Sequence, residues 1–115
     1  IYTGRQKEQI SAMLLMELTM LEWNDKNYRG AIQCADKAIE VISHSRSIEY
    51  IGELHLIKAK ALEKCYHEKD WDKEEDNCKN ECLMSYYTFD IMKNENGKQE
   101  VQKFCEEKLQ WQIIK

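Results

Sequence analysis

The chain has 115 residues, enough for one domain, and a formal net charge of −4. Charged residues make up 33% of it and hydrophobic residues 43%, which is the balance of a soluble globular domain. The basic residues form no dense cluster, so we expect no nucleic-acid contact by this segment. The apolar stretch near its start is too short to span a membrane, so we expect no membrane contact either.

Apolar residues recur at helical spacing through almost the whole sequence, and no window alternates like a β-strand. Proline is absent and glycine occurs only four times, so little interrupts helix formation. The pattern predicts five helices, over about residues 6–23, 28–43, 48–69, 73–93 and 98–113. The first contains SAMLLMELTMLEW (residues 11–23), which is apolar on nearly every side.

The segments between these helices are polar. Residues 24–27 form a predicted turn after the first helix, and residues 44–47 break the pattern after the second. Asp72 has Glu75 three residues on, the capping-box spacing, so we predict that Asp72 caps the fourth helix. Residues 94–97 (Asn-Glu-Asn-Gly) have the composition of a turn before the last helix.

The second helix carries small residues at helical spacing. Ala31, Ala35 and Ala38 follow Tyr28 in YRGAIQCADKAIEV, and this arrangement resembles the second helix of a tetratricopeptide repeat (TPR). The third and fourth predicted helices resemble a second such unit, whose small positions are filled by Cys78, Cys82 and Ser85. Cys78 follows Ala31 by 47 residues, whereas the repeat normally has about 34, so the second unit is divergent.

The resemblance implies an all-α fold and one domain covering residues 1–115. We expect a TPR-like right-handed stack of antiparallel helical hairpins, with the final helix as a C-terminal cap. In such a stack Leu15, Leu18 and Thr19 of the first helix would face its partner helix, and Leu14 and Leu21 would face a preceding hairpin.

The same resemblance predicts which side chains line the concave face. Methionine is flexible and polarizable, and a methionine row suits an adaptable groove for a peptide or a helix. An alternative is that these residues pack against helices upstream of residue 1 or against a second subunit, as in a homodimer. The predicted concave residues are Met13, Met16, Met20 and Trp23 of the first helix, and Leu56, Lys60, Glu63 and His67 of the third.

The C-terminal half has a second, more particular resemblance. GELHLIKAKALEKC, CKNECLMSYYTFDIM and GKQEVQKFCEEKLQW resemble the end of bacterial Xre-type helix-turn-helix transcriptional regulators that carry a degenerate TPR array. The resemblance implies a cytoplasmic protein whose array binds a protein or short peptide, dimerises, and relays binding to a DNA-binding domain. That domain would precede Ile1, so we expect the chain to be part of a longer protein. A static TPR adaptor without a transcriptional role is the alternative.

Catalytic and metal chemistry have weaker support in the sequence. The five cysteines are an odd number, most lie beside apolar residues, and we expect them to be reduced core residues. A zinc site built from Cys65, His67, Cys78 and Cys82 is a minor alternative. Ser43-His44-Ser45 has no aspartate placed to orient its imidazole, and the glycines are isolated, so we expect neither an enzyme nor a cofactor.

Overall fold

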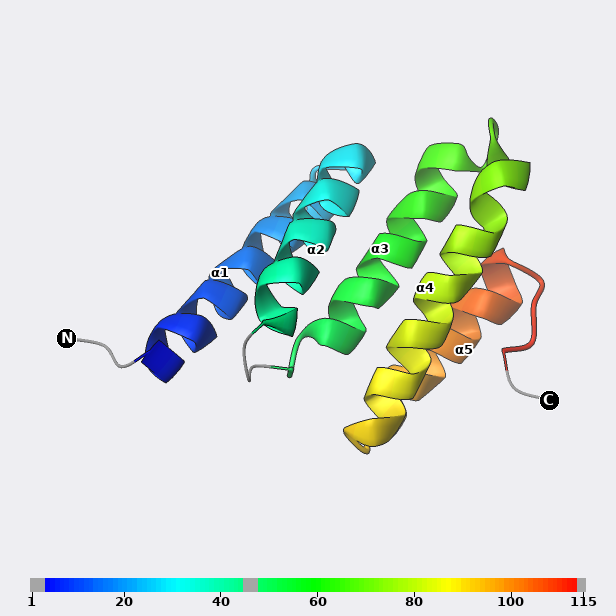
Figure 1. Ribbon diagram of the computed structural model, residues 1–115. Helices are drawn as coiled ribbons and strands as arrows, with labels where there is room; N and C mark the ends of the chain where they lie inside the picture. Colours follow the sequence, from blue (N-terminus) through cyan, green and yellow to red (C-terminus); the bar gives the residue numbers. More distant parts are fainter. Residues whose placement is uncertain (1–3, 45–47, 114–115) are drawn as a thin grey trace.

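Five α-helices make up the fold in the computed structural model, which describes residues 4–44 and 48–113 (Figure 1). They are α1 (Gly4–Asn24), α2 (Tyr28–Ser43), α3 (Ile51–Tyr66), α4 (Trp71–Ile91) and α5 (Glu95–Lys108). The described residues contain no strand. The predicted all-α stack of helical hairpins is therefore confirmed. None of the described helices combines the length and apolar character needed to cross a membrane.

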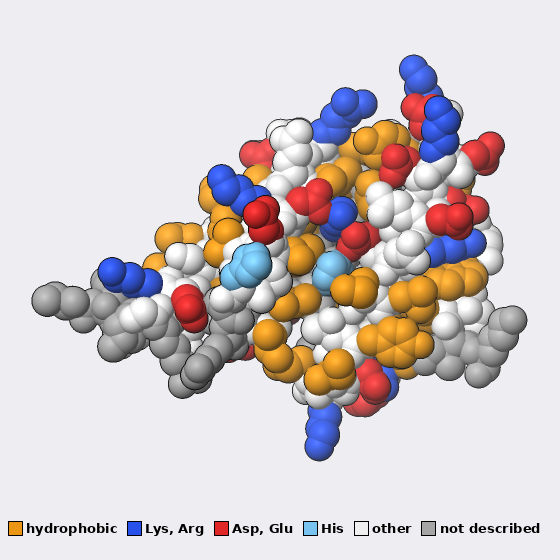
Figure 2. All heavy atoms as spheres, in the orientation of Figure 1, with side chains coloured by type: hydrophobic (Ala, Val, Ile, Leu, Met, Phe, Trp, Pro, Cys, Tyr) orange, Lys and Arg blue, Asp and Glu red, His pale blue; other side chains and the backbone are white. Residues whose placement is uncertain are grey.

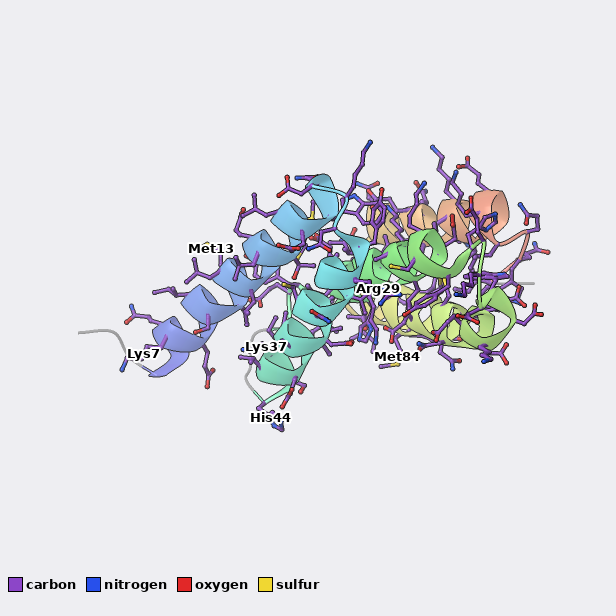
Figure 3. The ribbon with its side chains drawn as sticks, turned by 90° about the horizontal axis from the view of Figure 1, so that it is seen from above. Lys7, Met13, Arg29, Lys37, His44 and Met84 are labelled. Carbon is purple, nitrogen blue, oxygen red and sulfur yellow. The ribbon has the colours of Figure 1, made fainter. Side chains whose placement is uncertain are left out.

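The helices form two layers, and each helix packs mainly against its neighbours in sequence. Every helix contacts the next one along the chain, and α3 also contacts α1 and α5. Within the described residues, α1 and α5 make no direct helix contact, and neither do α2 and α4. Figure 3 shows the result from above, with α1 and α5 on one side of the molecule and α2 and α4 on the other. The inner layer is thus α1–α3–α5, and α3 lies between the other two helices of that layer.

Two hydrophobic clusters hold the layers together, and α3 contributes to both. One joins α1, α2 and α3 through residues such as Met16, Ile42 and Leu54, and the other joins α3, α4 and α5 through residues such as Leu62 and Phe89. The prediction that small residues lie on the packed faces of the helices is confirmed. Six of them have no solvent exposure: Ala31, Ala35, Ala38, Cys78, Cys82 and Ser85.

The ends of α4 and α5 differ from the sequence prediction. Helix α4 already begins at Trp71, so Asp72 lies in its first turn, and the preceding Asp70 has a left-handed backbone (φ 64°) with no side-chain cap. Helix α5 begins at Glu95 because Asn94 caps it, its Oδ1 accepting a hydrogen bond from the Gly97 backbone N–H at 3.0 Å. The predicted turn over residues 94–97 is therefore the first turn of a helix. The predicted break after α2 falls largely on residues 45–47, which lie outside the described residues.

One residue of α1, Leu18, departs from the expected packing. The packed face of α1 contains Ala12, Met16 and Thr19, which are buried, whereas Leu18 is 50% exposed. The prediction that Leu18 faces α2 was wrong because α1 is apolar all round, and hydrophobic periodicity cannot select its packed side. The opposite side of α1 is exposed and carries three large apolar residues, Leu14, Leu18 and Leu21.

Candidate functional site

A groove runs along the inner face of α3, between α1 and α5. It consists of two adjoining cavities of about 490 and 340 Å³, which share Trp23, Lys60 and Glu100. The groove exists because α1 and α5 both pack on α3 but not on each other. We call it the α1–α5 groove. The larger cavity is lined by Met16, Met20, Trp23, Glu53, Leu56, Ile57, Lys60, Phe89, Asn94, Asn96, Gly97 and Glu100. The smaller is lined by Trp23, Lys60, Glu63, Lys64, Glu100, Lys103, Phe104, Glu107 and Lys108.

The floor of the larger cavity is apolar. Met16, Leu56 and Phe89 are buried in the hydrophobic clusters, and each also borders the groove. Met20 and Trp23 are half-buried along the α1 wall, and the Trp23 ring packs against Tyr28 with their centroids 5.2 Å apart. An apolar side chain that binds here would be removed from water and would pack on a preformed surface. This transfer is favourable in proportion to the apolar area that it buries.

Two carboxylates face this apolar floor from opposite helices. Glu53 lies near the start of α3, Glu100 lies on α5, and both line the larger cavity. Burial, reinforced by the charge of Glu100, raises the pKa of Glu53 above its ordinary value. Within the described residues neither carboxylate forms an ion pair. Lys60 lines the same cavity, but it does not lie within ion-pair distance of either carboxylate, so this end of the groove carries a net negative charge.

The other end of the groove is rich in lysine. Lys60, Lys64, Lys103 and Lys108 line the smaller cavity together with Glu63 and Glu107. Within the described part of the chain, none of the four ammonium groups lies within ion-pair distance of a carboxylate. Glu63 lies next to His67 instead, with 3.8 Å between Oε2 and Nδ1. These lysines are thus available to an anionic group of a ligand.

The groove gathers six of the eight side chains predicted for the concave face: Met16, Met20, Trp23, Leu56, Lys60 and Glu63. Met13 is not among them, because it lies about two helical turns before Met20, nearer the start of α1, where it points away from the rest of the stack (Figure 3) and is 46% exposed. His67 lies just beyond the last residue of α3, and its ring is 6.3 Å from that of Trp71. It borders a separate cavity at the turn between α3 and α4.

The second wall of the groove was not predicted from the sequence. Glu100, Lys103, Phe104 and Lys108 all come from α5, which was expected only to act as a cap. The predicted order of the helices in the stack could have indicated this second wall. A helix that follows two hairpins continues the inner layer, and its inward side chains then face the same groove as those of the first and third helices.

A network of ionisable side chains, buried at His55 and Glu81 and exposed at Asp36, joins α2, α3 and α4. His55 Nδ1 lies 2.5 Å from Glu81 Oε2, and Lys58 Nζ lies 2.9 Å from Glu81 Oε1 and 2.6 Å from Asp36 Oδ1. Burial alone would raise the pKa of Glu81, but hydrogen bonds from His55 and Lys58 outweigh it and lower that pKa. Hydrogen bonds to Asp36 and Glu81 likewise overcome the effect of burial and raise the pKa of Lys58. The network links the two hairpins.

The cysteines contribute to packing. Cys78, Cys82 and Cys105 are fully buried in the cluster of α3, α4 and α5, and Cys78 Sγ lies 3.2 Å from the Ala59 carbonyl oxygen. All five thiols are free. Among the residues described, no group of three or more histidine, cysteine, aspartate or glutamate side chains is arranged to hold a metal ion.

A second apolar surface lies on the outer side of α4. Met84, Tyr87 and Ile91 are spaced at one face of the helix and are 54%, 58% and 76% exposed. Figure 2 shows hydrophobic side chains gathered over this part of α4, on the face of the molecule opposite the groove. Met84 points outward in Figure 3.

Comparison with known proteins adds no further information: no family model, curated protein or solved structure matches this chain. The resemblance to Xre-type regulators therefore stays a prediction from the sequence. The groove itself is the feature from which a function can be inferred.

Proposed function

We propose that this chain is a protein-binding helical repeat domain that holds a short peptide, or an extended segment of a partner protein, in the α1–α5 groove. The observation that carries the proposal is the combination of an apolar floor with charged walls, whose lysines and whose carboxylates Glu53 and Glu100 have no ion-pair partner within the described residues. Its two cavities are each in the size range typical of ligand sites.

The groove chemistry favours a peptide over a purely apolar ligand. Burying apolar side chains on Met20 and Leu56 would supply affinity, and the charged groups on α3 and α5 would fix register and orientation. An acyl chain would satisfy the floor but would leave the carboxylates and lysines without partners. A peptide supplies both kinds of contact.

A matched pair of α1 variants tests the site. Met20→Asp places a charge on the groove wall, and Leu18→Asp places one on the exposed outer side of the same helix. With a randomised hexapeptide library as the probe, Met20→Asp is expected to abolish enrichment and Leu18→Asp to preserve it. Loss of binding in Leu18→Asp alone would instead place the partner on the outer side of α1. Circular dichroism of both variants checks that the helices are retained.

The cellular role that we propose is that of a sensory and oligomerisation domain in a cytoplasmic bacterial transcriptional regulator. The support is the resemblance of residues 52–65, 78–92 and 97–111 to Xre-type regulators. Ligand binding between α1 and α5 would favour one curvature of the stack, by no more than the ligand's difference in affinity between the two arrangements. Sequencing upstream of Ile1 tests this role, since a static adaptor would have no helix-turn-helix there.

A dimer interface is a second candidate function, favoured by a different surface. Leu14, Leu18 and Leu21 form an exposed apolar row on α1, and exposed rows of this kind commonly mark protein contacts. Sedimentation of the wild-type chain and of Leu18→Asp distinguishes the two functions. A dimer that Leu18→Asp dissociates would assign the outer side of α1 to self-association, and a monomer at all concentrations would exclude that role.

A further inference from the structure

Charge is distributed unequally along the α1–α5 groove. Glu53 and Glu100 border its larger cavity, while Lys64, Lys103 and Lys108 border only the smaller one. Helices α3 and α5 run in the same direction, because each is antiparallel to α4, so the carboxylates lie toward the beginnings of both helices. The lysines lie toward their ends. Lys60 and Glu100 line both cavities, and Glu63 and Glu107 line the smaller one as well. Carboxylates therefore outnumber lysines two to one in the larger cavity, and lysines outnumber carboxylates four to three in the smaller, which gives the groove a net acidic end and a net basic end.

The length of the groove can be estimated from α3. Glu53 and Lys64 are eleven residues apart on this helix, which is a rise of about 16 Å at about 1.5 Å per residue. An extended peptide advances about 3.3 Å per residue, so about five or six residues cover that distance. A helical ligand would need about eleven residues for the same span.

Building on the proposed function, we propose that the groove selects an extended segment of five or six residues with opposite charges at its two ends. A cationic side chain or amine at one end lies between Glu53 and Glu100, and apolar side chains cover Met20 and Leu56. A carboxylate at the other end lies among the lysines of α3 and α5.

Two observations support this charge order independently of the apolar floor. The carboxylate of Glu53 is partly desolvated and repelled by that of Glu100, and its pKa is raised as a result. A cation between them would relieve that repulsion. At the other end, Lys103 and Lys108 have no ion-pair partner within the described residues, so an anion there displaces no internal salt bridge.

The experiment uses four hexapeptide sublibraries with blocked termini and randomised apolar centres, so that only side chains carry charge. Two have opposite charges at their ends, in either order, one is basic at both ends, and one is acidic at both ends. Enrichment on the immobilised chain is expected to favour one opposite-charge sublibrary at least about tenfold over both same-charge ones.

Charge-reversed variants test which end of the groove selects each charge of the peptide. Glu53→Lys with Glu100→Lys is expected to shift enrichment to peptides that are acidic at both ends. Lys103→Glu with Lys108→Glu is expected to shift it to peptides that are basic at both ends. The control, Glu49→Lys with Glu106→Lys, changes the net charge as much as the first variant does, on exposed residues that do not line the groove. It should keep the wild-type preference.

The outcomes separate this inference from the proposed function. Equal enrichment of all four sublibraries, lost on Met20→Asp, would overturn the charge order and leave peptide binding in place. A shift of preference in the Glu49 and Glu106 control equal to that of the groove variant would also overturn it, since net charge would then suffice. No enrichment of any sublibrary would overturn both proposals.

Discussion

The ring of Phe89 on α4 occupies the space that a side chain at Gly97 on α5 would need. A Cβ atom at position 97 would lie 2.5 Å from Phe89 Cδ1, and one at Gly52 on α3 would lie 2.8 Å from Phe89 Cε1. The ring is therefore seated between two helices whose backbones approach it closely. Since Phe89 and Gly97 also border the groove, this packing helps to set the distance between its α3 floor and α5 wall.

Replacing Gly97 with alanine is expected to destabilise the fold. The added methyl group must displace the buried Phe89 ring, and overpacking of this kind costs about 1–3 kcal/mol. Urea denaturation measures the loss in the free energy of unfolding. Gly4→Ala is the matched control, because a Cβ atom added at Gly4 would meet no other atom within 4 Å, and it should leave stability unchanged or slightly raised.

Glu81→Gln is expected to destabilise the junction of α2, α3 and α4. The substitution removes the charge that His55 and Lys58 share, and leaving a buried partner without its charged acceptor costs about 1–3 kcal/mol. Glu95→Gln is the control, since Glu95 is exposed and lies 3.5 Å from Lys98 in a surface pair. It should cost less than about 0.5 kcal/mol. Equal effects of the two substitutions on the urea midpoint would show that the buried network contributes nothing beyond a surface pair.

The contribution of Glu81 depends on pH in a defined direction. Because the pKa of Glu81 is lower in the folded chain than its ordinary value of 4.5, the unfolded chain binds the proton more readily. The stabilisation is thus fully present above pH 4.5 and decreases as the pH falls through the folded pKa. The difference in unfolding free energy between wild type and Glu81→Gln should shrink over this range. A difference that stays constant from pH 7 to pH 3 would contradict the assignment.

The five cysteines should separate into two classes of thiol reactivity. Cys34 and Cys65 are partly exposed, and burial, aided at Cys34 by the charge of Glu22, raises the pKa of each thiol. They should react slowly with a disulfide reagent at pH 7 and faster at pH 9. The buried thiols of Cys78, Cys82 and Cys105 should react only after the chain is unfolded in urea. Modification of more than two thiols in the native chain would contradict the buried cluster.

The start of α5 gives a test of helix capping. Asn94→Ala removes the acceptor for the Gly97 backbone N–H and should cost about 0.5–2 kcal/mol. Asp72 lies within the first turn of α4 and does not cap it. Asp72→Ala should therefore cost only a few tenths of a kcal/mol, which is the usual contribution of a negative charge near a helix N-terminus. Thermal unfolding of the two variants gives the comparison, and a larger loss for Asp72→Ala would restore the capping box predicted from the sequence.

The parts of the fold that follow from local chemistry were predictable from the sequence. Ala31, Ala35 and Ala38 share one helical face, and close packing of that face requires only small side chains. The exposure of Leu18 was not predictable in this way, because Leu14, Leu15 and Leu18 give α1 apolar groups on several sides. The packed face of α1 is selected by contacts with α2 and α3.

The candidate site was partly predictable for a similar reason. Met16, Met20 and Trp23 repeat along α1 and mark the groove wall, whereas the contribution of α5 depends on how far the stack continues. The network of Asp36, His55, Lys58 and Glu81 joins residues from three helices. No short-range spacing in the sequence identifies such a set, since its members meet only after the helices have packed.

The arrangement of helix contacts has a consequence for how the chain reaches its native state. Each helix packs on the one that follows, and the remaining contacts skip only a single helix, so the contact order of the fold is low. Chains of low contact order close short loops at small entropic cost and reach the native topology rapidly. Since α3 belongs to both hydrophobic clusters, we expect its amides to exchange with solvent more slowly than those of α1.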